Sequence, residues 1–129
     1  MTEKEVIAYF FRVRKLVNIK GIEEAAGLKA FRLNNIMKGV NHHLTPNEVM
    51  SLIPIIMELS SGNVTTQDEL LEFIAHLQNR KFITKRGIGK AANLKDNRLN
   101  NVMLSSFSAF SKEEFERLVN IMKSFKINN

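Results

Sequence analysis

Apolar residues recur at helical spacing along most of the chain. In two segments that lie 64 residues apart, they occupy one face of a helix. The residues concerned are Val6, Ile7, Phe10 and Val13 in the first segment and Leu70, Leu71, Ile74 and Leu77 in the second. A spacing near 3.6 residues favours helices throughout, so we expect an all-α protein in which each half begins with the same kind of helix.

Polar residues between the apolar stretches predict where the helices begin and end. Four pairs have the spacing of a capping box, with a hydroxyl residue three positions before a glutamate. These pairs are Thr2 and Glu5, Thr45 and Glu48, Thr66 and Glu69, and Ser111 and Glu114. Asn18 and Thr84 are expected to cap a short second helix that ends at Gly27 or Asn93, before a tight turn and a third helix. Pro54 should kink or split the last helix of the first half, and residues 123–129 (KSFKINN) should be a frayed end.

An internal repeat dominates the sequence. Residues 21–37 (GIEEAAGLKAFRLNNIM) and 87–103 (GIGKAANLKDNRLNNVM) are identical at 11 of 17 positions, with an offset of 66. A repeat of this length predicts one supersecondary unit used twice. We expect a first unit over residues 1–59, a linker over 60–65 and a second unit over 66–126. Because the first helices are offset by 64 and not 66, we expect the two extra residues in the connection that follows the first helix of the second unit.

Composition and charge narrow the class of protein. The chain has 129 residues, 44% of them hydrophobic, and a formal net charge of +6. The basic excess occurs in both halves, which favours a polyanionic partner, although excess surface lysine also serves solubility. The sequence contains no cysteine, and it contains neither an apolar run long enough for a membrane span nor the pattern of a secretory signal. We therefore expect a cytoplasmic protein that does not associate with membranes.

The spacing around Gly27 resembles the lambda repressor-like and Cro-like family of helix-turn-helix DNA-binding domains. That family has apolar residues five positions before the turn glycine and one, six and nine after it, with a second glycine twelve after. The matching residues here are Ile22, Leu28, Leu33, Ile36 and Gly39. The resemblance extends over roughly residues 2–59. It departs at Glu23 and Gly89, where the family usually has alanine, and at Asn93 and Ser105, where the second unit lacks the glycines. The implied fold is two tandem lambda repressor-like units of four to five helices each.

The resemblance also implies which residues meet DNA. Ala30 and Phe31 in the first unit, and Asp96 and Asn97 in the second, fall where the family's recognition helix faces base edges. Ala30 and Phe31 offer only apolar contact, for example to a thymine methyl group. Asn97 can pair with adenine, whereas Asp96 either accepts from cytosine or marks a unit that has lost base contact.

Further polar residues of the repeat are expected beside these. Lys29 and Lys95 are expected where the recognition helix begins, and Arg32 and Arg98 one turn later. All four are predicted phosphate or guanine ligands, with ordinary solvated helix charges as the alternative. Asn35 and Asn101 are expected to face the groove, and Asn34 and Asn100 to satisfy neighbouring helix groups. The expected DNA-tracking loop carries Lys38 and Asn41 in the first unit but Leu104 and Phe107 in the second, which favours the first unit as the better reader.

The leading hypothesis is sequence-specific binding to double-stranded DNA by a transcriptional regulator with two recognition helices in the major groove. Family members usually dimerise to present two such helices about 34 Å apart, and one chain with two units can do so alone. Two alternatives remain. One is a protein-interaction module or homodimer that uses exposed aromatics, with Phe31, Phe107 and Phe110 as candidates, and the other is nonspecific DNA coating. We expect no enzyme, no cofactor and no metal site, since His42 and His43 lack a third ligand at useful spacing.

Overall fold

The computed structural model describes residues 1–39, 43–105 and 107–127, and within these ranges the chain is all-α, with eight helices and no strands. Four helices lie in the N-terminal half (residues 1–59) and four in the C-terminal half (residues 66–127). They are α1 (Glu3–Val13), α2 (Ile19–Ala26), α3 (Arg32–Met37), α4 (Pro46–Leu59), α5 (Gln67–Asn79), α6 (Lys85–Ala91), α7 (Arg98–Leu104) and α8 (Lys112–Ser124). The predicted all-α fold class is confirmed.

The helix ends follow the predicted caps. All four capping boxes form with both of their hydrogen bonds, at the starts of α1, α4, α5 and α8. Asn18 and Thr84 each accept a hydrogen bond from the backbone three residues later and so cap α2 and α6. Gly27 ends α2 with a φ of 71°, and Asn93 follows α6 with a φ of 55°. Glycine and asparagine tolerate this left-handed conformation, which is why the chain turns at these two positions.

Three details of the predicted elements are wrong. Pro54 does not split α4, which continues from Pro46 to Leu59, whereas the alternative of a kink stays a prediction. The proline lies on the exposed side of the helix, as does Met50, whose carbonyl would have accepted the missing amide hydrogen bond. The two extra residues of the C-terminal half belong to α5, which has 13 residues against 11 in α1, while both following connections have the same length.

The third correction concerns the start of the predicted recognition helices. We expected them to begin near Lys29 and Lys95, but α3 begins at Arg32 and α7 at Arg98. The residue before each helix, Phe31 or Asn97, has a left-handed φ of 67° or 63°. A residue in this conformation cannot continue a right-handed helix. The repeated RLNN string therefore opens each helix and does not occupy its middle.

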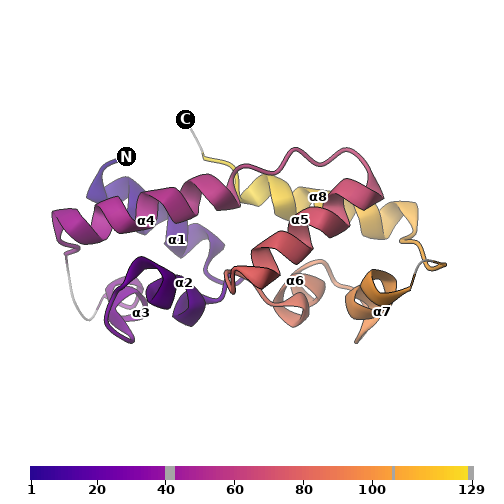
Figure 1. Cartoon of the computed structure of the whole chain (residues 1–129), viewed down its shortest axis with the longest axis horizontal. Coiled ribbons are helices and arrows are strands. Elements are labelled where there is room, and N and C mark those ends of the chain that lie inside the picture. Colours follow the sequence, from indigo (N-terminus) through magenta and orange to yellow (C-terminus); the bar gives the residue numbers. More distant parts are fainter. Residues whose placement is uncertain (40–42, 106, 128–129) are drawn as a thin grey trace.

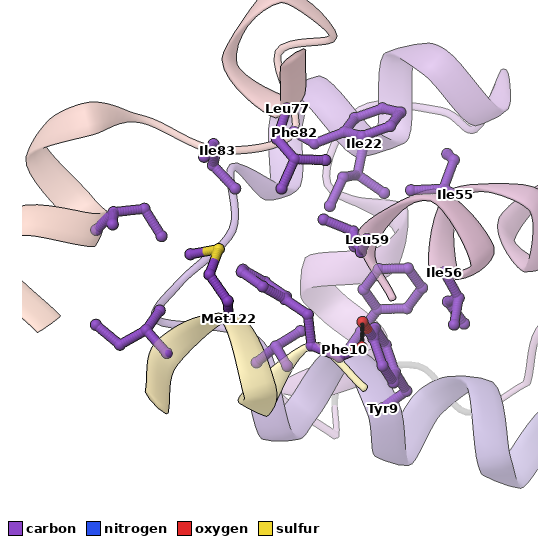
Figure 2. Packing of buried hydrophobic residues seen from close by; sticks show 14 of the residues in the cluster. Tyr9, Phe10, Ile22, Ile55, Ile56, Leu59, Leu77, Phe82, Ile83 and Met122 are labelled. Carbon is purple, nitrogen blue, oxygen red and sulfur yellow. Dashed lines mark hydrogen bonds between the residues drawn. The ribbon is translucent and has the colours of Figure 1, made fainter. Parts of the chain in front are cut away.

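The buried apolar residues, apart from Val102, form one continuous core that extends through both halves. Figure 2 shows Phe10, Ile22 and Leu59 of the N-terminal half together with Phe82 and Met122 of the C-terminal half. All five side chains are almost or completely inaccessible to solvent. The halves therefore share the apolar surface that each would expose alone, which fixes how they sit relative to one another.

Contacts between the halves are reciprocal at the spacing of the repeat. A Cβ atom placed on Gly21 would lie 1.9 Å from the Lys81 carbonyl oxygen, and the equivalent Cβ on Gly87 would lie 4.0 Å from the Lys15 carbonyl oxygen. Lys126 donates to the Ser60 carbonyl oxygen at 2.8 Å. These two residues occupy the same position of the repeat, so here the two halves meet through equivalent residues. Contacts in which equivalent residues exchange roles arise when two like bodies are related by a two-fold axis. The relation is approximate, because the Gly21 approach is much the closer.

A second reciprocal pair lies where the first helix of each half meets the last helix of the other. Arg12 of α1 donates to the Ser124 carbonyl oxygen at the end of α8. At the equivalent positions, His76 of α5 lies 3.5 Å from a carboxylate oxygen of Glu58 near the end of α4, and Arg80 binds the same oxygen at 3.0 Å.

The segment after α8 takes part in this contact, so the predicted frayed end is wrong as far as residue 127. Phe125 is fully buried, and its carbonyl oxygen accepts a hydrogen bond of 2.6 Å from the Tyr9 hydroxyl. Burial raises the pKa of Tyr9 well above its ordinary value, so the hydroxyl remains a donor. Ile127 packs against the core.

The short helices gather along one side of the molecule. Figure 1 shows α2, α3, α6 and α7 along the lower edge, with α3 and α7 toward its two ends and α2 and α6 between them. The longer helices α1, α4 and α8 lie above them in this view. Both copies of the repeated sequence therefore reach the same side of the protein.

Candidate functional site

The predicted base-reading residues lie in the turns that precede α3 and α7. Lys29, Ala30 and Phe31 are all exposed, and Phe31 keeps 66% of its surface accessible. At the equivalent positions of the C-terminal half, the exposed residues are Lys95, Asp96 and Asn97. Each half thus presents a short projecting turn, with one lysine and two further side chains, on the edge where the short helices gather (Figure 1).

Both arginines of the RLNN strings are paired with other groups of the same chain. Arg32 makes two hydrogen bonds of 2.9 Å to the Glu48 carboxylate, and Arg98 makes two of 3.0 Å to Glu114. The Nη2 group of each arginine also donates to a carbonyl oxygen in the loop that follows, at His43 or Ala109. Because each glutamate belongs to a capping box, this network fastens the short helix to the start of the next long one.

Pairing with arginine lowers the pKa of both carboxyl groups. The Arg98 hydrogen bond, together with the backbone amide of Ser111, holds the pKa of Glu114 at about 2, below its ordinary value of 4.5. The Arg32 hydrogen bond likewise lowers the pKa of Glu48. That either arginine also binds phosphate or guanine stays a prediction, but the observed role of both is structural.

A buried carboxylate organises the turn before α3. Glu23 is 4% exposed, and its oxygens accept from the backbone amides of Phe31 at 3.3 Å, Leu33 at 2.7 Å and Asn34 at 3.2 Å. Phe31 supplies no side-chain cap for α3. Glu23 thus satisfies amides that a helix start leaves free, and it holds Phe31 in a conformation that is costly for a bulky residue.

In the C-terminal half, the turn before α7 has the same left-handed conformation without a buried carboxylate. Gly89 stands at the position of Glu23, and a Cβ atom there would meet only the Leu99 Cβ, at 3.9 Å. Asn97 replaces Phe31, and asparagine adopts the left-handed conformation at lower cost. An open pocket of about 710 Å³ lies between α6 and the turn before α7. Its lining includes Lys85, Arg86, Lys90, Lys95 and Arg98 as well as Asp96.

The remaining predicted site residues have mixed positions. Lys38 and Asn101 are exposed, and Asn35 is partly buried. Asn41 lies outside the described residues. Asn100 accepts a hydrogen bond of 2.8 Å from the Lys85 ammonium group, which confirms that its side chain serves a neighbouring helix.

The exposed aromatics were predicted only in part. Phe31 and Phe107 are exposed as predicted, at 66% and 98%, and the aliphatic Leu104 is also exposed, at 75%. Phe110, by contrast, packs against the core, its amide donates to Gln67 at 2.8 Å, and the Arg98 guanidinium lies 5.8 Å from its ring centre. Phe110 is therefore structural and does not form part of an exposed aromatic surface.

The described residues contain no group of three or more side chains arranged to hold a metal ion. Of the two predicted loop histidines, His42 lies outside the described ranges, while His43 contacts the Glu3 carboxylate at 3.1 Å. Over the same ranges, no helix has the length and apolar character that crossing a bilayer requires.

The basic character of α6 was not predicted from the sequence. At the repeat offset of 66, Ile19, Lys20, Glu23 and Glu24 of α2 correspond to Lys85, Arg86, Gly89 and Lys90 of α6. This charge difference is readable from the aligned repeat. The loop residues Lys38 and Asn41, against Leu104 and Phe107 in the second unit, instead favoured the first unit as the better reader.

Comparison with known proteins gave no match: no family model, no curated protein and no solved structure matches this chain.

Proposed function

We propose that this protein binds double-stranded DNA sequence-specifically as a single chain, with two lambda repressor-like helix-turn-helix units, and that it acts as a transcriptional regulator. In this proposal α2 with α3, and α6 with α7, are the two helix-turn-helix pairs. The turns that carry Lys29 to Phe31 and Lys95 to Asn97, together with the first turns of α3 and α7, enter successive major grooves.

The observation that carries the proposal is the reciprocal arrangement of the halves. A two-fold relation that brings both short helix pairs to one edge is the geometry with which dimeric repressors meet a duplex, because duplex DNA has local two-fold symmetry of its own. The net charge of +6 supports the same partner, since lysines near phosphates release counterions. A shared core keeps the spacing of the two pairs fixed, so their target half-sites should also have one fixed spacing.

The two turns differ in chemistry, so the target should have unlike halves. The exposed Phe31 ring beside Ala30 suits a thymine methyl group. Asn97 suits adenine, and Asp96 suits the amino group of cytosine. A two-fold relation between the units then predicts an inverted repeat whose two half-sites differ in sequence.

Binding to a pool of random duplexes across a salt series tests the proposal. The affinity should fall steeply with salt, with log K falling by about 0.9 per log unit of salt for each phosphate neutralised. Lys29→Ala and Lys95→Ala should each lower the affinity, and Lys112→Ala, at an exposed lysine where α8 begins, is the matched control. If the wild-type chain binds no duplex at low salt, the proposal fails.

A protein-binding function is the second candidate, and exposed Phe107 and Leu104 favour it. At these positions the N-terminal half has Asn41 and Lys38, and exposed large apolar side chains are a feature of contact surfaces. Phe107→Ser separates the two functions. It should leave duplex binding within about twofold of wild type if this surface serves a protein partner, whereas a large loss of duplex affinity would assign Phe107 to DNA.

A further inference from the structure

The N-terminal half provides an internal carboxylate at a place where the C-terminal half is open. Glu23 binds the backbone amides of Phe31, Leu33 and Asn34. The residues at the equivalent positions of the repeat, Asn97, Leu99 and Asn100, all line the pocket beside α6. The pocket therefore includes the place that the Glu23 carboxylate occupies in the other half, and Gly89 leaves that place without a side chain.

The charge around this open site is strongly positive. Arg86 and Lys90 of α6, together with Lys95 of the turn, line the pocket and are exposed. Lys85 also lines the pocket, with its ammonium group held by Asn100, and Asp96 is the one acidic residue among the lining residues. In α2 the residues that correspond to Gly89 and Lys90 are both glutamates. In the N-terminal half the Glu23 carboxylate is the anion beside these amides, whereas in the C-terminal half lysine and arginine side chains surround the equivalent pocket.

We propose that this α6 pocket is a phosphate-binding site, that the N-terminal half lacks it, and that it holds the DNA backbone beside α7. The assignment to DNA rests on the proposed function, whereas the preference for phosphate does not. A phosphate group presents several anionic oxygens to the lysines and arginine, as Glu23 presents two oxygens to the equivalent amides. The C-terminal half then supplies more of the electrostatic affinity, and the N-terminal half depends more on its apolar turn.

Gly89→Glu is the most direct test, because it places a glutamate in the C-terminal half at the position that Glu23 has in the N-terminal half. The new carboxylate should occupy the part of the pocket beside the Asn97, Leu99 and Asn100 amides and take the place of a phosphate. Folding should not suffer, because glutamate is a better helix former than glycine. We expect an unchanged or higher Tm together with duplex affinity that is lower by roughly tenfold or more, since a like charge then faces the backbone.

Charge removal gives an independent test with a matched control. The Arg86→Ala, Lys90→Ala double variant should lower the salt slope of duplex binding by about 0.9, the value for one phosphate that is no longer neutralised. Lys112→Ala removes an exposed lysine of α8, outside both helix-turn-helix pairs, and should leave the slope unchanged. If the wild-type chain binds duplex DNA but the double variant and Lys112→Ala have the same slope, the assignment of this site to DNA is wrong while the proposed function stands.

Titration with inorganic pyrophosphate, followed by backbone NMR, tests the phosphate chemistry without DNA. Shifts confined to Gly89, Asn97, Leu99 and Asn100, and abolished in Gly89→Glu, would support the site even if no duplex bound. The absence of such shifts, together with an unchanged salt slope in the double variant, would overturn it. Pyrophosphate binding with an unchanged slope would overturn the assignment to DNA and point to a free phosphate ligand.

Discussion

Gly21→Ala should loosen the contact between the two halves, while Gly87→Ala at the equivalent position should not. The new Cβ at Gly21 would lie 1.9 Å from the Lys81 carbonyl oxygen, whereas real Cβ atoms essentially never approach within 3.0 Å. The obstacle is backbone and not a flexible side chain, so α2 and the segment around Lys81 must move apart. The nearby hydrogen bond of 2.7 Å from the Asn18 amide to the Phe82 carbonyl oxygen joins the same two segments.

The expected cost follows from these contacts. Overpacking costs about 1–3 kcal/mol, and a strained or broken backbone hydrogen bond adds about 1 kcal/mol. Alanine in a helix returns about 0.5–1 kcal/mol relative to glycine. The free energy of unfolding should therefore fall by about 1–3 kcal/mol, which lowers Tm by roughly 5–10 °C for a chain of this size. Gly87→Ala meets only the Thr84 hydroxyl at 3.0 Å and the Lys15 carbonyl oxygen at 4.0 Å, so it should be close to neutral.

Urea denaturation followed by circular dichroism measures both variants on the same scale. Equal urea midpoints for Gly21→Ala and Gly87→Ala would show that the close approach of α2 to Lys81 does not constrain the fold. If the proposed function holds, Gly21→Ala should also weaken duplex binding more than its lower stability alone explains, because the spacing of the two helix pairs changes.

Three further variants test other contacts. Glu23→Gln should lower the free energy of unfolding by about 2–3 kcal/mol, because the carboxylate accepts from three amides; exposed Glu24→Gln is the control, and equal urea midpoints would contradict this role. The pKa of Glu114 is held at about 2, so its stabilisation is complete above its ordinary pKa of 4.5 and disappears as pH falls toward 2. Glu114→Gln should therefore lower Tm at neutral pH but much less in strong acid, and a Tm difference independent of pH would count against the Arg98 pair. Tyr9→Phe should cost about 1–2 kcal/mol in urea unfolding, since it leaves a buried carbonyl unpaired, and a neutral result would show that this hydrogen bond does not hold the halves together.

The helices could be predicted well from the sequence because their ends depend on local chemistry. The capping boxes and Gly27 act within a few residues, so each could be recognised without the rest of the fold. The start of α3 could not, because a left-handed Phe31 contradicts local preference. In the N-terminal half the Glu23 carboxylate supports this conformation from the preceding helix, whereas α7 begins at the same position after Asn97 without such a carboxylate. Hydrogen bonds from a side chain to backbone amides of another element leave no pattern in the sequence around the helix start.

The candidate site was predicted less completely for the same reason. The repeated arginines were expected to bind phosphate or guanine, because the resemblance to helix-turn-helix domains implies that they lie one turn into a recognition helix. Each instead pairs with a glutamate 16 residues later, and this spacing is identical in both copies. The relation between the halves was also beyond sequence reasoning, since Gly21 and Lys81 meet only because a common core brings α2 and the segment after α5 together.

Selection from a pool of random duplexes with the intact chain is the decisive measurement, because the selected DNA records the geometry of the two halves. We expect one enriched motif, bound by a single chain, that contains two unlike half-sites in inverted orientation at one fixed spacing. A direct repeat, or no enriched motif at all, would contradict two-fold binding by the paired helix-turn-helix units.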